Sequence, residues 1–184
     1  MTIRDIAGFC PEKAIWKMMA DVSSYLTNED VVYYFSPDSI TIDGEMFMVE
    51  NGACMQNEFV APECIEGGKT GTKQMVWSLG SVAYFAATGH IIFGGHGSIY
   101  QKDNPSVPLP VLPKNYQALT AVLHKCICYN PDKRISMAEV NDLAQQGLAS
   151  CEKHKREKRE VEEKEIESIK KSIGEKWPED MVEI

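Results

Sequence analysis

Ala61-Pro62-Glu63, separated by twelve residues from Val76-Trp77-Ser78-Leu79-Gly80, is the stretch of this chain that decides the fold. The second run lies in a segment, from about Lys73 to Ala87, whose side chains are apolar on most sides. A helix that is apolar all round is buried all round. We therefore expect a central buried helix on which the rest of the domain is assembled.

The segments before this helix predict a second helix and a short hairpin. From Pro11 to Leu26 apolar residues recur at three- and four-residue steps, which is typical of a helix with one buried face. Between Ile40 and Val49 two apolar runs flank Asp43-Gly44-Glu45, and the Asp-Gly pair is a hairpin turn signal. This hairpin is the only sheet that the sequence predicts.

The segments after the central helix predict further helices. Residues 104–113 contain four prolines, which favours an extended crossing segment. A helix is expected from about Lys114 to Tyr129. Ser136 and Glu139 form a capping box that opens a last core helix. The fold class expected is therefore mainly α, with one short β-hairpin.

A change of composition divides the chain into a domain, residues 1–150, and a charged helical tail, residues 151–184. The tail is rich in Glu, Lys and Arg, and its regularly spaced apolar residues are Val161, Ile166, Ile169 and Ile173. Three roles are open to this thin apolar stripe. It can dock on the domain, pair with a second copy of the chain, or stay in solvent.

Composition narrows the class of partner. The chain has 184 residues and a formal charge of −8, which argues against nucleic acid and anionic membrane surfaces and favours a basic partner. No apolar run reaches the length of a membrane span. The six cysteines form no C-x-x-C pair and no apolar leader opens the chain, so we expect reduced thiols in a cytoplasmic protein.

The order of these landmarks resembles the large lobe of a protein kinase. In kinases an Ala-Pro-Glu triplet closes the activation segment, and a Trp-Ser-Leu-Gly run begins the buried helix of the lobe. The hairpin at Ile40–Val49, before this triplet, and the turn at Asn130–Arg134, after the buried helix, also lie in the expected order. The resemblance covers about residues 10 to 148 and implies a helical kinase C-lobe-like domain without the small lobe.

The resemblance also implies that the catalytic groups are missing. The positions of the kinase His-Arg-Asp triplet fall on Val32, Tyr33 and Tyr34, while Ser36 takes the place of the catalytic-loop lysine and Ser39 that of the asparagine. We therefore expect no catalysis, no bound cofactor and no metal site.

Two further positions follow from the same resemblance. The magnesium triplet Asp-Phe-Gly corresponds to Glu50-Asn51-Gly52, which keeps a carboxylate at Glu50 alone. Glu63 and Arg134 coincide with the glutamate and arginine that form a buried ion pair in kinase lobes, so both are assigned to architecture.

A kinase large lobe without its catalytic loop resembles the kinase non-catalytic C-lobe domain (KIND) family, which uses the lobe to bind a segment of another protein. The resemblance implies a non-catalytic pseudokinase lobe that binds a peptide or helix of a partner, and the acidic charge suggests a basic segment. The alternative is a degenerate or split serine/threonine kinase with residual nucleotide binding through Glu50. Self-association through the tail is a further possibility.

Overall fold

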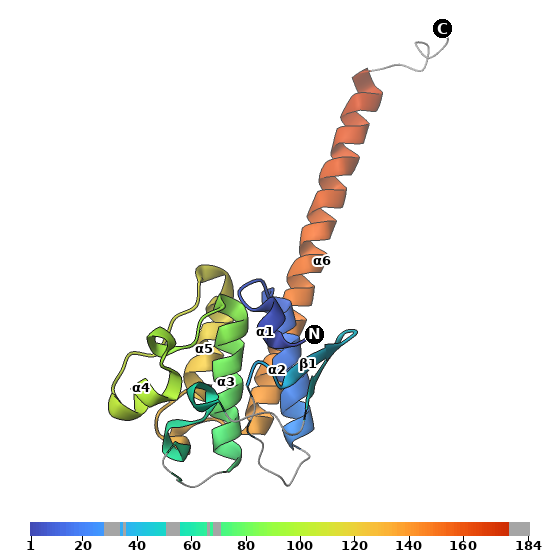
Figure 1. Cartoon of the computed structure of the whole chain (residues 1–184). Coiled ribbons are helices and arrows are strands. Elements are labelled where there is room, and N and C mark those ends of the chain that lie inside the picture. Colours follow the sequence, from blue (N-terminus) through green and yellow to red (C-terminus); the bar gives the residue numbers. More distant parts are fainter. Residues whose placement is uncertain (28–33, 35, 51–55, 66, 68–70, 177–184) are drawn as a thin grey trace. The chain divides into compact units, whose positions relative to one another are not determined.

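The computed structural model describes residues 1–27, 34, 36–50, 56–65, 67 and 71–176 of the chain (Figure 1). It divides into two units, Met1–Leu148 and Ala149–Ile184, which are called here the lobe and the tail. The sequence had placed the boundary between residues 150 and 151. Each unit is described by itself.

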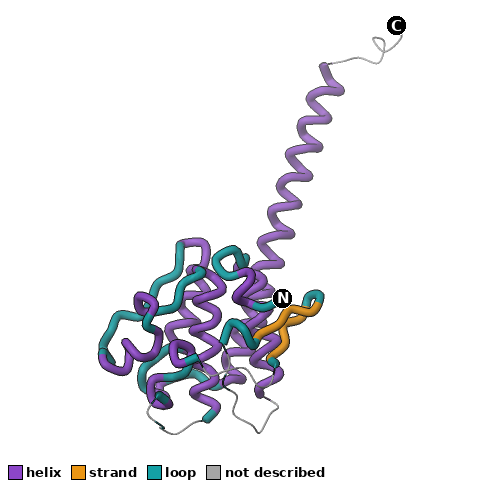
Figure 2. The backbone as a smooth tube through the Cα atoms, in the orientation of Figure 1, coloured by secondary structure: helices purple, strands orange, loops and turns teal. Residues whose placement is uncertain are grey.

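The described part of the lobe is mainly helical, with one antiparallel pair of strands (Figure 2). This confirms the expected fold class. The helices are α1 (Ile3–Ile6), α2 (Glu12–Thr27), α3 (Thr72–Thr88), α4 (Gly97–Asp103), α5 (Gln117–Cys126) and the beginning of α6 (Met137–Lys176). The strands are β1 (Ile40–Asp43) and β2 (Met46–Val49).

Helix α3 is the centre of the lobe, and it lies between α2 and α5 (Figure 1). All of its residues from Gln74 to Ala83 are buried, as the apolar pattern predicted. Gly80 lets α5 approach closely, because a Cβ atom there would lie 2.6 Å from the Cβ of Cys126. The helix ends at Gly89, whose positive φ of 72° is the left-handed conformation that closes many helices.

The hairpin packs on α2, and its strands pair Ile40 with Val49 and Asp43 with Met46. Ile40 and Phe47 are buried on the inner face. The hairpin forms where it was predicted, but Asp43 of β1 pairs with Met46 of β2, so the two turn residues are Gly44 and Glu45 rather than Asp43 and Gly44. Gly44 has φ 59°, which suits glycine at the first turn position. The outer edge of β1 carries an isolated bridge to Thr2, so the N-terminal residues lie against the hairpin.

Three helices, α1, α4 and α5, differ from the prediction, and the short α1 was not expected. Helix α4 was also not expected, because its seven residues follow a glycine-rich run. It is held by a contact with a distant segment, in which the hydroxyl of Ser98 donates to the carbonyl of Asn57 at 2.7 Å. The helix expected from Lys114 to Tyr129 begins as a 3-10 turn and ends at Cys126. Beyond this end, the carbonyls of Cys128 and Tyr129 accept hydrogen bonds from Arg134.

The tail, taken by itself, is helical up to Lys176, and α6 runs through 40 residues. Ion pairs at four-residue spacing join Lys153 to Glu157 and Lys158 to Glu162, each at 3.8 Å. Such pairs support an isolated helix. The apolar stripe is 52–57% exposed, at Val161, Ile166, Ile169 and Ile173. Among the described residues no helix combines the length and the apolar character needed to cross a membrane.

Candidate functional site

The structure brings Glu63 and Arg134 together in a two-pronged ion pair. Arg134 Nη1 donates to Glu63 Oε1 at 2.6 Å, and Nη2 donates to Oε2 at 2.8 Å. Such fork-to-fork geometry is the strong form of an arginine–carboxylate contact. The pair ties the Ala-Pro-Glu turn to the segment that leads into α6.

Arg134 also organises backbone groups around it. Its guanidinium donates to the carbonyls of Cys128 at 2.6 Å, Tyr129 at 2.9 Å and Lys73 at 3.3 Å. In return, the ammonium of Lys73 donates to the carbonyl of Arg134. The expectation that both partners are buried needs correction. The Arg134 side chain is fully buried, whereas that of Glu63 is 23% exposed, although its neighbours Pro62 and Cys64 are buried.

A second buried contact was missed by the sequence reading. The indole of Trp77 donates to Gln101 Oε1 at 2.9 Å, and Gln101 Nε2 donates to the carbonyl of Ile127 at 2.9 Å. The oxygen and the nitrogen of the Gln101 side-chain amide therefore both have hydrogen-bond partners inside the core, as buried polar groups need. Its only sequence signal was a polar residue in a short segment with no clear pattern.

The positions assigned to the catalytic lysine and asparagine lie in a turn that is closed by its own hydrogen bonds. The backbone N–H of Ser36 donates to Ser39 Oγ at 2.8 Å, and this hydroxyl donates to the carbonyl of Ser36 at 2.9 Å. Both residues are buried. Ser39 Oγ is therefore used within the turn, and neither serine offers a cationic or amide group to a phosphate.

The remaining assigned positions are only partly described. Tyr34 is partly exposed, and Glu50 is exposed just after β2, where its N–H donates to the carbonyl of Ser39 at 2.8 Å. The structure thus brings Glu50 and Ser39 together through the backbone. Val32, Tyr33 and the pair Asn51-Gly52 lie outside the described residues.

A polar cluster joins the N-terminal segment to this turn. Arg4 Nε donates to Asp38 Oδ1 at 2.5 Å and Nη2 to Oδ2 at 2.8 Å, while Gln56 accepts from Arg4 at 2.9 Å and donates to Asp38 at 2.6 Å. The guanidinium lies 5.4 Å from the centre of the Phe85 ring. The Arg4 hydrogen bond lowers the pKa of Asp38, and Asp38 in turn raises the pKa of Arg4. The sequence reading did not single out any of these side chains.

Replacement of Asp38 by Asn is expected to loosen residues 1–8 while the core of the lobe stays folded. Asp38 and Arg4 are each 42% exposed, so the loss of stability should stay below about 1 kcal/mol. The lowered pKa means that the stabilisation is present above the ordinary value, about 3.9, and is lost as the pH falls through the folded-state pKa. Hydrogen exchange of the α1 amides measures the effect. Asp43→Asn is the control. Equal exchange rates of the α1 amides in Asp38→Asn and Asp43→Asn would show that the Arg4–Asp38 ion pair does not hold residues 1–8 in place.

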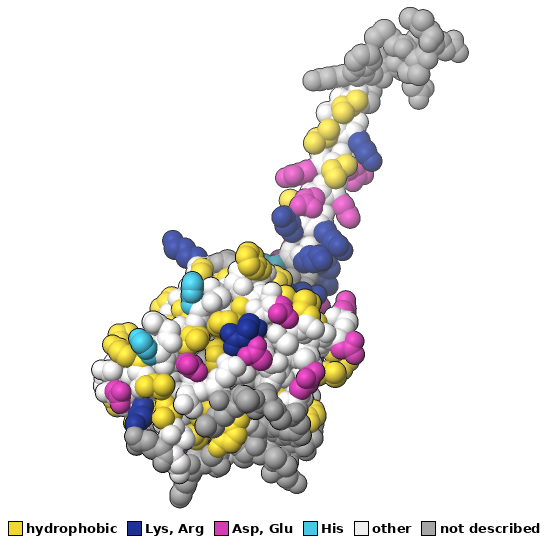
Figure 3. All heavy atoms as spheres, viewed as in Figure 1, with side chains coloured by type: hydrophobic (Ala, Val, Ile, Leu, Met, Phe, Trp, Pro, Cys, Tyr) yellow, Lys and Arg dark blue, Asp and Glu magenta, His cyan; other side chains and the backbone are white. Residues whose placement is uncertain are grey.

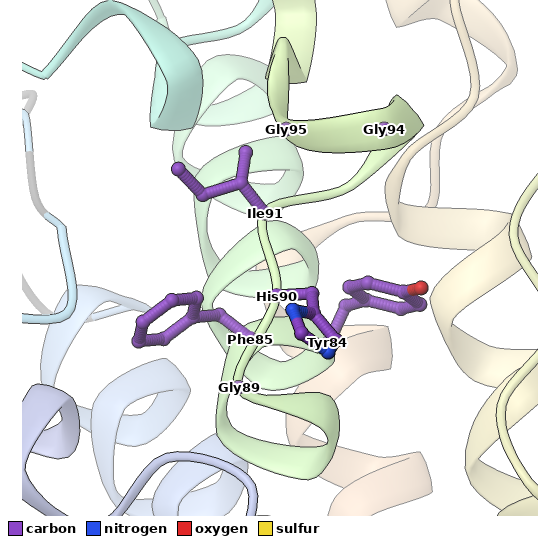
Figure 4. Close-up of a pocket in the computed structure, with 7 residues that line it drawn as sticks. All are labelled: Tyr84, Phe85, Gly89, His90, Ile91, Gly94 and Gly95. Atoms are coloured by element: carbon purple, nitrogen blue, oxygen red, sulfur yellow. The ribbon is translucent and has the colours of Figure 1, made fainter.

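Two hollows of the described lobe border some of these groups: Phe85 lines one, and Gln101, Cys128 and Tyr129 line the other. The larger, of about 400 Å³, lies at the end of α3, where Phe85 and Ile91 extend to one side of the segment 89–91 and Tyr84 and His90 to the other (Figure 4). Glycines 89, 94 and 95 complete its lining. The smaller, of about 320 Å³, lies between the proline segment and residues 128–133. No carboxylate lines either hollow, so neither presents the paired acid and base of a hydrolytic site.

The cysteines and acids of the described residues form no group of three that could hold a metal ion. The five cysteines of the described part of the chain are thiols rather than disulfides; Cys10, Cys64 and Cys126 are buried, while Cys128 and Cys151 are partly exposed. Burial raises the pKa of Cys10 to about 11 and that of Cys126 to about 12. These buried thiols are poor nucleophiles, because the reactive form is the thiolate.

Comparison with known proteins identifies the family. The model of the protein kinase domain family matches residues 43–144, more than half of the chain, and the chain therefore belongs to this family. An aurora kinase of Schizosaccharomyces pombe (strain 972 / ATCC 24843) is 28% identical over 143 residues, which is 66% of this chain and 39% of that kinase. The chain thus spans about two fifths of the length of this curated relative.

The matched range separates the assigned residues into two groups. Glu50, Glu63 and Arg134 lie inside it, whereas Tyr34, Ser36 and Ser39 precede residue 43. The assignment of these last three positions to the catalytic loop rests on their spacing from the hairpin. The kinase-like lobe is established by the match together with the helical architecture around α3.

Proposed function

We propose that this kinase-family lobe is a pseudokinase, closest to the KIND family, that works as a protein-interaction module without catalysis. The observation that carries the proposal is the turn at Ser36 and Ser39. Protein kinases use charged and amide side chains in the catalytic loop to accept a proton, neutralise phosphate and hold magnesium. Here the corresponding side chains are two short, buried hydroxyl groups.

The charge of the lobe supports a protein partner of particular chemistry. Residues 1–150 contain sixteen Asp and Glu against ten Lys and Arg. An acidic surface speeds the association of a basic segment and repels nucleic acid. Exposed apolar side chains on the lobe supply anchors, among them Phe9, Met46 and Val111. A cytoplasmic location, consistent with thiols rather than disulfides, belongs to the same proposal.

A second candidate is a degenerate or split kinase that keeps some nucleotide binding. It is favoured by the exposed carboxylate of Glu50 and by the likeness to an aurora kinase. In this case the small lobe would come from another polypeptide, and Glu50 would contact the magnesium ion of a nucleotide complex.

Melting curves in millimolar MgATP separate the two candidates. We expect no shift, because the positions assigned to the phosphate and magnesium contacts hold Ser36 and Ser39. A ligand at one hundred times its dissociation constant would stabilise the fold by about 2.7 kcal/mol, a shift of several degrees for a chain of this size.

Glu50→Gln is the matched control for this measurement. An upward shift in the wild type that is absent from Glu50→Gln would favour the degenerate kinase. Transfer of labelled phosphate from ATP to a general kinase substrate, in the presence of the wild type alone, would refute the absence of catalysis directly.

A further inference from the structure

The outward face of the hairpin carries two exposed methionines. Side chains alternate between the faces of a strand, so Ile40 and Phe47 point into the lobe while Met46 and Met48 lie on the opposite face. Met46 is 57% exposed and Met48 is 44% exposed. Their cross-strand neighbours are Asp43 and Thr41. Methionine is a flexible, polarizable side chain that is frequent on surfaces that bind varied apolar partners.

Both edges of the hairpin are already occupied near its centre. On the side of β1, the N–H of Ile42 donates to the carbonyl of Met1 at 2.9 Å, and Thr2 bridges Thr41. On the side of β2, the N–H of Phe47 donates to Asp21 Oδ2, on α2, at 3.0 Å. A strand that is blocked at its edge resists the addition of another strand. A partner can therefore use the face of the hairpin more readily than its edges.

The chemistry around the methionines is acidic. Residues 36–50 contain four carboxylates, Asp38, Asp43, Glu45 and Glu50, and no Lys or Arg. The helices that contact the hairpin carry three cations, Arg4, Lys13 and Lys17; Arg4 on α1 is paired with Asp38, and Lys17 on α2 with Asp21. Figure 3 shows acidic and hydrophobic side chains together at the edge of the lobe where Figure 1 places the hairpin.

We propose that this outward face, defined by Met46 and Met48 with Asp43, Glu45 and Glu50, docks an amphipathic, Lys/Arg-bearing segment of a partner protein. The proposal rests on the interaction function given above and names its surface. Apolar side chains of the segment pack on the two methionine side chains. Its basic side chains face the carboxylates, which steer the approach of the segment and set its orientation.

The test uses the whole chain and a defined probe. A peptide is selected from a random sixteen-residue display library on the wild-type protein alone. The selected peptide is then titrated while the ε-methyl signals of the methionines are followed by NMR. We expect Lys or Arg next to apolar residues in the peptide, and saturable shifts at the methyl groups of Met46 and Met48.

Three variants decide the outcome. Met46→Gln/Met48→Gln should weaken binding by at least about tenfold, since two half-exposed apolar side chains are lost from the contact. Asp43→Asn/Glu45→Gln should weaken it less and reduce its dependence on salt. Val111→Gln, which removes an apolar side chain 73% exposed elsewhere on the lobe, should leave binding unchanged.

Two results would overturn the proposal. One is a selected peptide that is acidic or whose binding is insensitive to salt. The other is a peptide that shifts the methyl signals of other methionines of the protein and leaves those of Met46 and Met48 unchanged. Neither result bears on the proposed absence of catalysis, because the melting curves in MgATP and the phosphate-transfer assay test that proposal separately.

Discussion

Replacement of Arg134 by alanine is expected to destabilise the lobe by about 3 kcal/mol, the lower end of the range for breaking a buried ion pair from one side, because the remaining carboxylate of Glu63 is 23% exposed. The substitution removes both hydrogen bonds to Glu63 and leaves the carbonyls of Cys128 and Tyr129 without their donor. A loss of this size is a large part of the stability of an ordinary domain. Urea unfolding measures it.

Two further variants locate the origin of this effect. Lys133→Ala removes an exposed cation one residue away and should melt like the wild type. Glu63→Gln should cost less than Arg134→Ala, because the Glu63 carboxylate is 23% exposed and water compensates part of the loss. If Arg134→Ala is no less stable than Lys133→Ala, the ion pair does not hold the turn to the lobe.

The second large effect is expected at Gly80, in the middle of α3. A Cβ atom there would lie 2.6 Å from Cys126 Cβ and 3.0 Å from Ile127 Cγ2. Alanine would gain about 0.5–1 kcal/mol of helix propensity. The overlap in a packed core costs more, about 1–3 kcal/mol, since α3 and α5 must move apart. Gly80→Ala is therefore expected to be destabilising, and Gly80→Val more so.

Gly71 provides the matched control, since no heavy atom lies within 4 Å of the position of its Cβ and its φ of −177° suits any residue. Gly71→Ala should cost less than about 1 kcal/mol, the loss expected for alanine instead of glycine at the N-cap of α3. A Gly80→Ala protein as stable as Gly71→Ala would show that α3 and α5 are not in close contact. Gly80→Ala should cost less in a Cys126→Gly background than in the wild type, because that background lacks the atom that the new methyl group meets; a double-mutant cycle measures the difference.

Several features could be predicted because they depend on residues close together in the chain. Short sequence patterns predict three of them: the burial of α3, the hairpin turn at Gly44, and the capping box of Ser136 and Glu139. The capping box is present, with the Ser136 N–H donating to the Glu139 carboxylate at 2.7 Å. Glu63 and Arg134 are 71 positions apart, and only their likeness to a family pattern, not any local signal, connected them.

Contacts between distant segments were decided by the tertiary structure. Arg4 meets Asp38 across 34 positions, and Trp77 meets Gln101 across 24, so no periodicity within a helix or strand reports them. Helix α4 is stabilised by such contacts, and for this reason its short sequence carried no helix signal.

The sequence by itself determined the mainly α lobe and the central helix. These depend on residue type and local period, which are properties of the chain alone. Only the tertiary structure decided that both edges of the hairpin are closed while Met46 and Met48 remain exposed. Exposure and edge pairing depend on the contacts that Met1, Thr2 and Asp21 make with the hairpin after folding. These residues are distant from the hairpin in the sequence, so no local pattern specifies the contacts.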